Sequence, residues 1–342
     1  MNRVELNMST TKLTRSGILI VALLCCGSGC ERNTAPAEPA SQESAQQSNV
    51  ISVFVSILPQ AYFVERIGGE RVHVETLVAS GQSPHTYAPT PQQVAGLERC
   101  AAFFSIGLPF EERLLSKAAT SLPNLNIVDC REGIELRIME GGHEHEEHEE
   151  GAAHEHPAAE EAEEHAGHEH GASLSAAEMD PHVWLDPKRA KTIAANICAE
   201  LCRLDPEHGE EYRANLKKLQ SELTELDERI AATLKPLQGR EFYVFHPAYG
   251  YFGDSYGLKQ VPVEIEGKDP TPQQIATLIE KAKAAGVRVI FVQPQFSSKS
   301  AAAIAKEIDG AVVALDPLAE DYIKNIDEMA RRLAEALGAA RP

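Results

Sequence analysis

Four residues outside the low-complexity part of the chain are of types that bind transition metals, and they stand at the ends of predicted structural elements. His85, in SGQSPHTY, follows the second predicted strand, and His246 directly follows the run EFYVF. Asp316 directly follows AVVAL, and His182, in DPHVWLDP, precedes a predicted helix. Three imidazoles and one carboxylate that meet on one face would suit a divalent transition metal, with tetrahedral zinc the first candidate.

Each of these side chains also has an ordinary structural interpretation. A lone histidine is more often a capping or hydrogen-bonding residue than a ligand, and Asp before Pro is common in turns. Of the five histidines outside the low-complexity stretch, His73 lies inside a predicted strand and His208 lies near the start of a long helix, and both are interpreted as structural or surface residues. The other three fall where a cleft is expected, which favours a metal site.

The elements that must position these residues are short β-branched runs alternating with helical segments, which is typical of parallel βα units. The sequence predicts an α/β fold of two lobes, each with a roughly four-stranded parallel sheet. In an open parallel sheet, ligands bind outside the carboxyl ends of the strands, where the candidate ligands stand. The predicted strands begin at Val50, Arg71, Ala101 and Leu125 in the first lobe, and at Glu241, Gln260, Val287 and Ala311 in the second.

One long helix is predicted between the two lobes. No Pro or Gly interrupts the chain from Glu210 to Lys235, and leucine or isoleucine recurs every three or four residues. Such a helix would span roughly 40 Å as a rigid connection, so large hinge closure is not expected. We predict an N-terminal lobe over residues 50–205, a linking helix over 206–238 and a C-terminal lobe over 239–342.

The N-terminus has the pattern of an export signal. Basic residues precede the apolar run GILIVALLCC, which is much shorter than the roughly 20 residues needed to span a bilayer. We predict a signal peptide over residues 1–29 and a lipidated Cys30, because GSGC resembles the lipobox of bacterial lipoproteins. Cys25 or Cys26 are alternative anchors, and plain signal-peptidase cleavage is the other interpretation. The Pro-, Ala-, Ser- and Gln-rich residues 30–49 are predicted to form a flexible tether.

Charge argues against nucleic-acid binding, and cysteine content bears on disulfide bonds. A formal net charge of -19 excludes a general nucleic-acid binder, because phosphate neutralisation needs clustered Lys and Arg. The four cysteines after the predicted anchor are interpreted as structural, without an assigned pairing, in a compartment that permits disulfides. They are Cys100, Cys130, Cys198 and Cys202.

Several motifs together resemble one family. SPHTYAPTPQQV, DPHVWLDP, FHPAYGYFGDSYGL and the segment from TPQQIATL to VVALDPL are similar to the zinc-type metal-binding lipoproteins of bacterial ABC transporters, the family of the high-affinity zinc uptake protein. The resemblance covers nearly all of the chain from Val50. It implies a metal between two lobes, with His85, His182 and His246 as ligands and Asp316 at a position that is a ligand only in some members. Manganese-type relatives have Glu where His246 stands.

The His/Glu-rich stretch, residues 141–171, holds eight His and eleven Glu. It has too few apolar residues to order itself, so a disordered loop over 141–172 is predicted. Its imidazoles are competent ligands at neutral pH, whereas the metalloprotease motif HExxH is absent. We interpret the loop as an accessory zinc-gathering element whose ends lie near the cleft, with a solvated acidic linker as the alternative. Its histidines are His143, His145, His148, His154, His156, His165, His168 and His170.

These observations predict a monomeric extracytoplasmic receptor, in the periplasm or on the outer cell surface, that is anchored by lipid. It would bind Zn²⁺ and deliver it to an ABC permease and its ATPase, without catalysis. A manganese or iron receptor, a zinc-binding adhesin or buffer, and a zinc hydrolase are the alternatives, although no motif supplies the general base that a hydrolase needs. Metal binding is expected to weaken as pH falls through the imidazole range.

Overall fold

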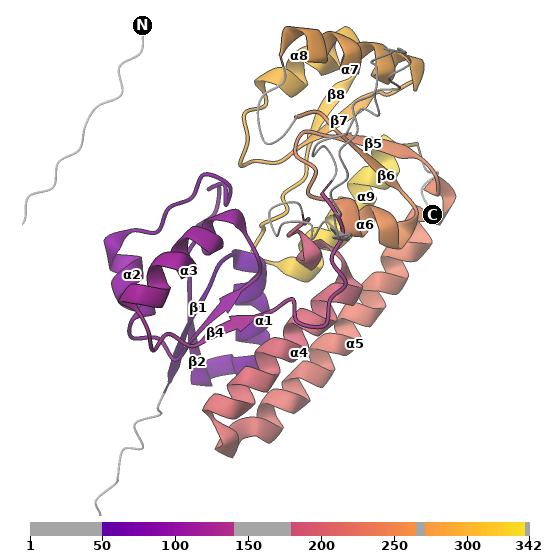
Figure 1. Ribbon diagram of the computed structural model, residues 1–342. Coiled ribbons are helices and arrows are strands. Elements are labelled where there is room, and N and C mark those ends of the chain that lie inside the picture. Colours follow the sequence, from indigo (N-terminus) through magenta and orange to yellow (C-terminus); the bar gives the residue numbers. More distant parts are fainter. Residues whose placement is uncertain (1–49, 140–178, 265–270, 339–342) are drawn as a thin grey trace, which may run out of the picture. The chain divides into compact units, whose positions relative to one another are not determined.

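A computed structural model of the chain describes residues 50–139, 179–264 and 271–338 (Figure 1). The predicted signal peptide, Cys30, the tether and the His/Glu-rich stretch lie outside these residues, so those predictions stand as made. From Ser48 onward the described residues belong to one compact unit. Among the described helices, none combines the length and the apolar character needed to cross a membrane.

The first sheet has four parallel strands in the order β2-β1-β3-β4. Strands β1 and β3 are central, and every residue of β3 is buried. Pro stands at the start of α2 and α3, where a missing backbone N–H costs no helical hydrogen bond. The elements are β1 (Ile51–Val55), α1 (Leu58–Gly68), β2 (Val72–Thr76), α2 (Pro91–Leu97), β3 (Ala102–Ser105), α3 (Pro109–Ser121) and β4 (Ile127–Asp129).

The second sheet repeats this arrangement, with four parallel strands in the order β6-β5-β7-β8. All eight strands lie where β-branched runs predicted them, and the α/β prediction with two parallel four-stranded sheets is confirmed. The elements are β5 (Glu241–Val244), α6 (Gly250–Tyr256), β6 (Lys259–Pro262), α7 (Pro272–Ala284), β7 (Val289–Val292), α8 (Lys299–Glu307), β8 (Ala311–Ala314) and α9 (Tyr322–Ala336).

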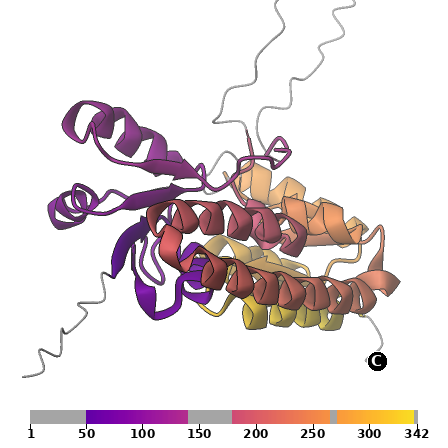
Figure 2. The same cartoon turned by 90° about the horizontal axis from the view of Figure 1, so that it is seen from below.

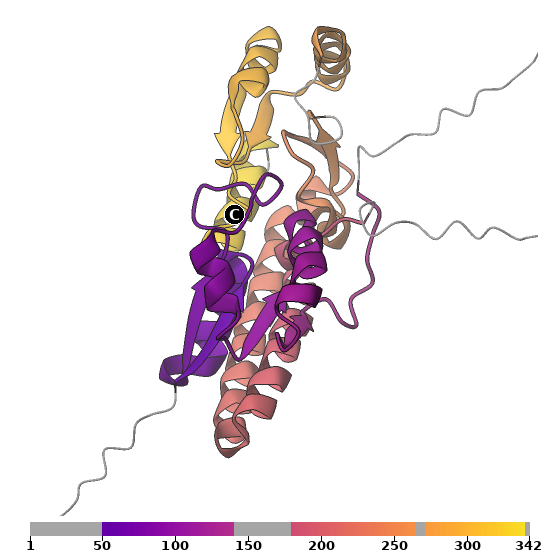
Figure 3. The same ribbon diagram turned by 60° about the vertical axis from the view of Figure 1, so that its left-hand side comes forward.

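The chain between the two sheets forms the helices α4 (Pro187–Leu204) and α5 (Gly209–Leu234). They lie side by side, as Figure 3 shows. Helix α5 has 26 residues, so the long helix predicted over 210–235 is present. Its buried residues recur every three or four positions and form one apolar stripe. The helix packs against α4 and α1 and also against α9, which Figure 2 shows beside it in yellow.

The end of the chain returns from the second sheet to the first half of the fold. The Tyr322 ring of α9 packs edge-on against Phe63 of α1, with ring centroids 4.8 Å apart. The Tyr322 hydroxyl donates to the Trp184 carbonyl at 2.7 Å, and the Trp184 indole donates to the Pro317 carbonyl at 2.8 Å. These contacts fix the segment after His182 against the segment after Asp316. The lobe boundaries proposed from the sequence stay a prediction.

Candidate metal site

Three histidine side chains from distant parts of the chain meet at one point. His85 lies in the loop between β2 and α2, His182 precedes the 3-10 turn Val183–Leu185, and His246 follows β5. The Nε2 atom of His246 is 3.0 Å from Nε2 of His85 and 3.3 Å from Nε2 of His182. The candidate ligand atoms of all three lie within 4.8 Å of one another. This arrangement is suited to a metal ion.

Two buried carboxylates orient two of these rings. Nδ1 of His182 donates to Oδ1 of Asp180 at 2.7 Å, and Nδ1 of His246 donates to Oε1 of Glu264. Because a carboxylate only accepts, the proton of each neutral ring stays on Nδ1, and the lone pair of Nε2 points at the other imidazoles. Carboxylate partners of this kind fix the tautomer and raise the basicity of metal-binding histidines.

The surroundings keep imidazoles of the site neutral. Burial, and then the proximity of His246 and His182, lowers the pKa of His85 from 6.5 to about 2. Burial also lowers the pKa of His246, although its hydrogen bond to Glu264 acts in the opposite direction. Both rings are therefore unprotonated at neutral pH. The Nε2 lone pairs of His182 and His246 face one another 3.3 Å apart and repel, and a cation between them would relieve that repulsion.

Apolar side chains form the wall of a small cavity around the three histidines. The Phe296 ring stacks on His246 with centroids 4.9 Å apart, and the Trp184 ring lies 5.2 Å from the ring of His182. Pro84, Pro317, Leu318 and Gln295 also line this cavity. A wall with so few polar groups lowers the local dielectric and strengthens any bond to a cation.

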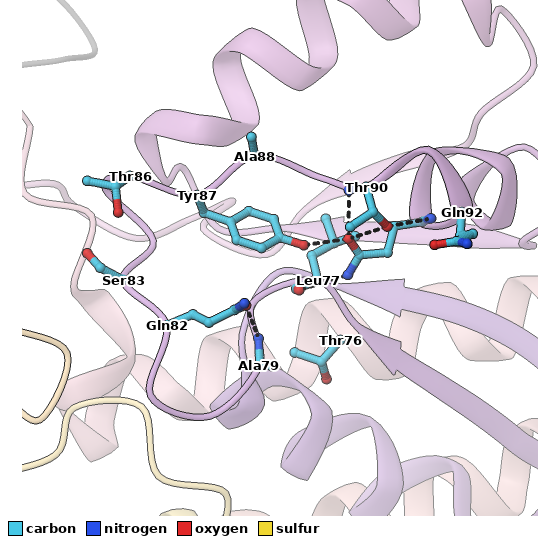
Figure 4. Close-up of a pocket in the computed structure, with 11 residues that line it drawn as sticks. Thr76, Leu77, Ala79, Gln82, Ser83, Thr86, Tyr87, Ala88, Thr90 and Gln92 are labelled. Carbon is cyan, nitrogen blue, oxygen red and sulfur yellow. Dashed lines mark hydrogen bonds between the residues drawn. The ribbon is translucent and has the colours of Figure 1, made fainter.

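The loop that carries His85 is fixed from its other side by Gln93 of α2 (Figure 4). Oε1 of Gln93 accepts from the Tyr87 hydroxyl at 2.7 Å, and its Nε2 donates to the Leu77 carbonyl at 2.9 Å. Oε1 also accepts from the amide of Thr90, which caps α2. A pocket opens here between the end of β2, the loop and the start of α2, and Thr76, Ser83 and Gln92 are among the residues that line it. Gln93 thus holds both ends of the His85 loop.

The described residues on both sides of the His/Glu-rich stretch lie together at the site. Ile138 and Met179 pair in an antiparallel bridge, so the stretch leaves and re-enters the fold at one point. Beside it, Nη1 of Arg137 lies 3.3 Å from Oδ2 of Asp180, the carboxylate that orients His182. A Cβ at Gly250 would overlap the Arg137 guanidinium, so glycine at this position lets Arg137 keep its place beside Asp180. The described residues that flank the stretch therefore lie beside the carboxylate that orients His182, as the prediction for its ends requires.

Asp316 is not among the groups that meet at this point. Its Oδ1 accepts from Nε2 of Gln295 at 2.7 Å and from the Leu318 amide at 3.0 Å. As a ligand it stays a prediction without geometric support. His73 is exposed on β2, and His208 pairs with a nearby aspartate, as their interpretation as surface or structural residues requires.

The four described cysteines are free thiols. Cys198 and Cys202, one turn apart on α4, have their Sγ atoms 3.9 Å apart, and burial is the main cause that raises the pKa of Cys198 to about 12. The Cys198 thiol is therefore protonated at neutral pH and is a poor metal ligand. The structure supports their interpretation as packing residues.

Sequence reasoning missed the two carboxylates that orient the histidines. Asp180 stands two residues before His182 in DPH, where Asp before Pro reads as a turn. Glu264 follows β6, and its ionisable side chain just past the carboxyl end of a strand, on the side of the sheet where ligands bind, is the signal that could have singled it out. Both are buried, and buried carboxylates need partners.

Comparison with known proteins agrees with this geometry. The family described as "Zinc-uptake complex component A periplasmic" matches residues 53–336. The high-affinity zinc uptake system protein ZnuA of Bacillus subtilis is 30% identical over 310 residues, which cover 89% of this chain and 88% of that protein.

Solved structures of ZnuA are similar as well. One has a TM-score of 0.72 at 37% identity and covers 84% of this chain and 100% of its own. The structure of a ZnuA variant that lacks residues 138-173 of its own numbering, with zinc bound, has a TM-score of 0.71 at 37% identity and covers 86% of this chain and 100% of its own. The chain therefore belongs to the family of zinc-uptake complex component A.

Proposed function

We propose that this protein is an extracytoplasmic receptor that binds Zn²⁺ between His85, His182 and His246 and delivers it for import. The convergence of three Nε2 atoms carries the proposal. Zinc–nitrogen bonds of 2.0–2.1 Å at tetrahedral angles place neighbouring nitrogens about 3.3 Å apart. The distances of 3.0 Å and 3.3 Å lie close to that separation. The site is thus nearly formed before the ion arrives.

The donor types favour zinc over the alternative metals. Imidazole nitrogen suits zinc, copper and nickel, whereas manganese and magnesium prefer carboxylate, carbonyl and water oxygens. Asp180 and Glu264 are hydrogen-bonded to Nδ1 of His182 and His246, and neither belongs to the group of described side chains that could hold the ion together. A manganese or iron receptor is the less well supported alternative for this donor set.

The same carboxylates argue against a zinc hydrolase. A hydrolase needs a general base within hydrogen-bond reach of a metal-bound water. Asp180 and Glu264 are committed to orienting the rings, and the family is one of transport receptors rather than of enzymes. We therefore assign no catalytic role to the site.

Delivery to an ABC permease and its ATPase is proposed from family membership and from the names of relatives that act in zinc uptake. The receptor would be a monomer held at the membrane through a lipid on Cys30. The His/Glu-rich stretch would gather zinc beside the site, because its two ends meet next to Asp180. The zinc-bound ZnuA variant that lacks an internal segment supports a division between a tight site and an accessory.

Zinc stoichiometry and affinity, measured by chelator competition, test this proposal. The mature protein, a variant lacking residues 141–172, and a His182→Ala variant are compared, with exposed His73→Ala as the matched control. We expect one tight zinc in the wild type, in the deletion variant and in His73→Ala, and its loss in His182→Ala. Tight binding that disappears with the stretch, or that survives in His182→Ala, would overturn the assignment.

A further inference from the structure

One residue in the wall of the zinc cavity carries an oxygen atom that has no hydrogen-bond donor. Gln295 lines the cavity with the three histidines, and its Oε1 is buried. Within residues 50–139, 179–264 and 271–338, no group donates to it. Buried polar atoms without a partner are rare in folded proteins, and each requires an explanation such as an absent water or ion. Because Gln295 belongs to the wall of the proposed metal site, a water bound to the metal is the explanation to test.

Asp316 determines which end of the Gln295 amide is left without a partner. Its Oδ1 accepts from Nε2 of Gln295 at 2.7 Å and from the Leu318 amide at 3.0 Å. A carboxylate only accepts hydrogen bonds, so the NH₂ group of Gln295 must face Asp316, and the carbonyl oxygen must face away from it. Asn325 donates to the Asp316 backbone carbonyl at 2.7 Å and holds the same turn. The amide orientation of Gln295 is therefore fixed by its neighbours.

Three imidazoles leave the fourth position of a tetrahedral zinc ion open. Zinc sites with three protein ligands hold a water there. That water has two hydrogens to donate, and most of the cavity wall is ring or aliphatic carbon from residues such as Phe296, Trp184 and Leu318. An acceptor among these groups would be the partner that such a water needs.

We propose that Oε1 of Gln295 accepts a hydrogen bond from the water that completes the coordination of the bound zinc, and that Asp316 acts by holding Gln295. This inference rests on the proposed zinc site. It makes Gln295 a positioning residue for the fourth ligand and removes the need for Asp316 to reach the metal. Because the amide is neutral, the bound ion keeps its full positive charge, which favours release over permanent retention.

The test is a double-mutant cycle on zinc affinity, with Gln295→Leu, Asp316→Ala and the double variant, and with exposed Gln273→Leu as the matched control. Loss of a hydrogen-bonding partner around a metal site typically weakens metal affinity about 10- to 100-fold, and we expect that range for Gln295→Leu. We expect Asp316→Ala to weaken binding no more than Gln295→Leu does, and the double variant to match Gln295→Leu alone, because residues that act through one another are not additive.

Three further readouts separate this role from a loss of folding. Gln295→Glu is made together with Asp316→Asn, whose amide can donate to the new carboxylate as Gln295 now donates to Asp316. This pair keeps an oxygen acceptor in the cavity wall and should restore or exceed wild-type affinity, with slower zinc release. The visible absorption of the Co²⁺-loaded protein, which reports the ligands of the ion, should change in Gln295→Leu but not in Gln273→Leu. The melting temperatures of the metal-free variants should stay close to that of the wild type.

The inference is overturned if Gln295→Leu keeps wild-type zinc affinity and the wild-type Co²⁺ spectrum. It is also overturned if Asp316→Ala weakens binding more than Gln295→Leu and the two effects add, because Asp316 would then contact the ion itself. These outcomes differ from a failure of the zinc receptor proposal, in which the unaltered protein itself would bind no zinc tightly.

Discussion

Zinc affinity should fall less between pH 7.5 and pH 5.5 than it would in a site of free imidazoles, because burial lowers the pKa of His85 and of His246. The sequence alone predicts full proton competition. Two free imidazoles with the ordinary pKa of about 6.5 would each be mostly protonated at pH 5.5, and together they would weaken binding about 100-fold, or about 2.7 kcal/mol. The pKa of His85 is lowered to about 2, so this ring has no proton to lose at pH 5.5, and the lowered pKa of His246 acts in the same direction.

The lowered pKa values also predict that the metal-free protein becomes less stable as pH falls. In the unfolded chain both histidines take up protons as pH falls below 6.5, whereas in the folded protein they do so only at lower pH, near pH 2 for His85. The stability that their neutral forms contribute is therefore fully present above pH 6.5 and is lost progressively as pH falls below that value. For each group the loss is at most about 1.4 kcal/mol per pH unit.

The assay is chelator competition at pH 7.5, 6.5 and 5.5 on the variant lacking residues 141–172, with the chelator's own pH dependence measured in parallel. Removing the stretch excludes its eight histidines from the signal. Thermal unfolding of the metal-free variant over the same pH range gives the stability. One freely titrating imidazole accounts for about a tenfold change over this interval. A fall in zinc affinity of 100-fold or more would refute the preformed neutral site.

Two other substitutions test the surroundings of the site, and a third tests a buried carboxyl group beside the first sheet. Glu264→Gln should weaken zinc binding about 10- to 100-fold in chelator competition, because His246 loses its charged partner; unchanged affinity would remove Glu264 from the site. Gln93→Leu frees the loop that it anchors and should weaken zinc binding about tenfold, since each lost hydrogen bond is worth about 1 kcal/mol; equal affinity and equal melting temperature would contradict this role. Glu111 is buried and accepts hydrogen bonds from three backbone amides, and burial raises its pKa to about 7. The folded protein therefore loses up to about 3 kcal/mol of stability as pH rises from 4.5 through 7, because the unfolded chain ionises this group more easily. The corresponding slope should be absent in urea unfolding of Glu111→Gln, and a slope equal to that of the wild type would refute it.

Much of the fold could be predicted because its signals are local. β-Branched runs marked all eight strands, and an uninterrupted leucine repeat marked α5. His85 and His246 could be singled out because each follows a strand end, where parallel sheets place their ligands. The sequence could not predict how close the three Nε2 atoms come, because that depends on packing between α9 and the first half of the fold.

The polar partners of the site were harder to foresee for a physical reason. The sequence around Asp180 indicates a turn, and that around Glu264 indicates the end of a strand. Their hydrogen bonds to histidine exist only because the fold buries them beside His182 and His246. Asp316 was singled out for its position after β8, but position alone does not distinguish a ligand from a residue that holds Gln295. The pH expectation changed for the same reason, since desolvation is invisible in the sequence.

The bridge between Ile138 and Met179 has a consequence for how this chain can vary. An insertion whose two ends are already joined places no demand on the rest of the fold, and doubling the length of a loop costs only about 0.6 kcal/mol in closure entropy. The number and order of histidines between these two residues can therefore drift, expand or contract over evolutionary time while the three-imidazole centre is conserved. The histidine-rich stretch can therefore adapt to how scarce zinc is in a habitat. The three-imidazole centre can adapt separately to the chemistry of the ion.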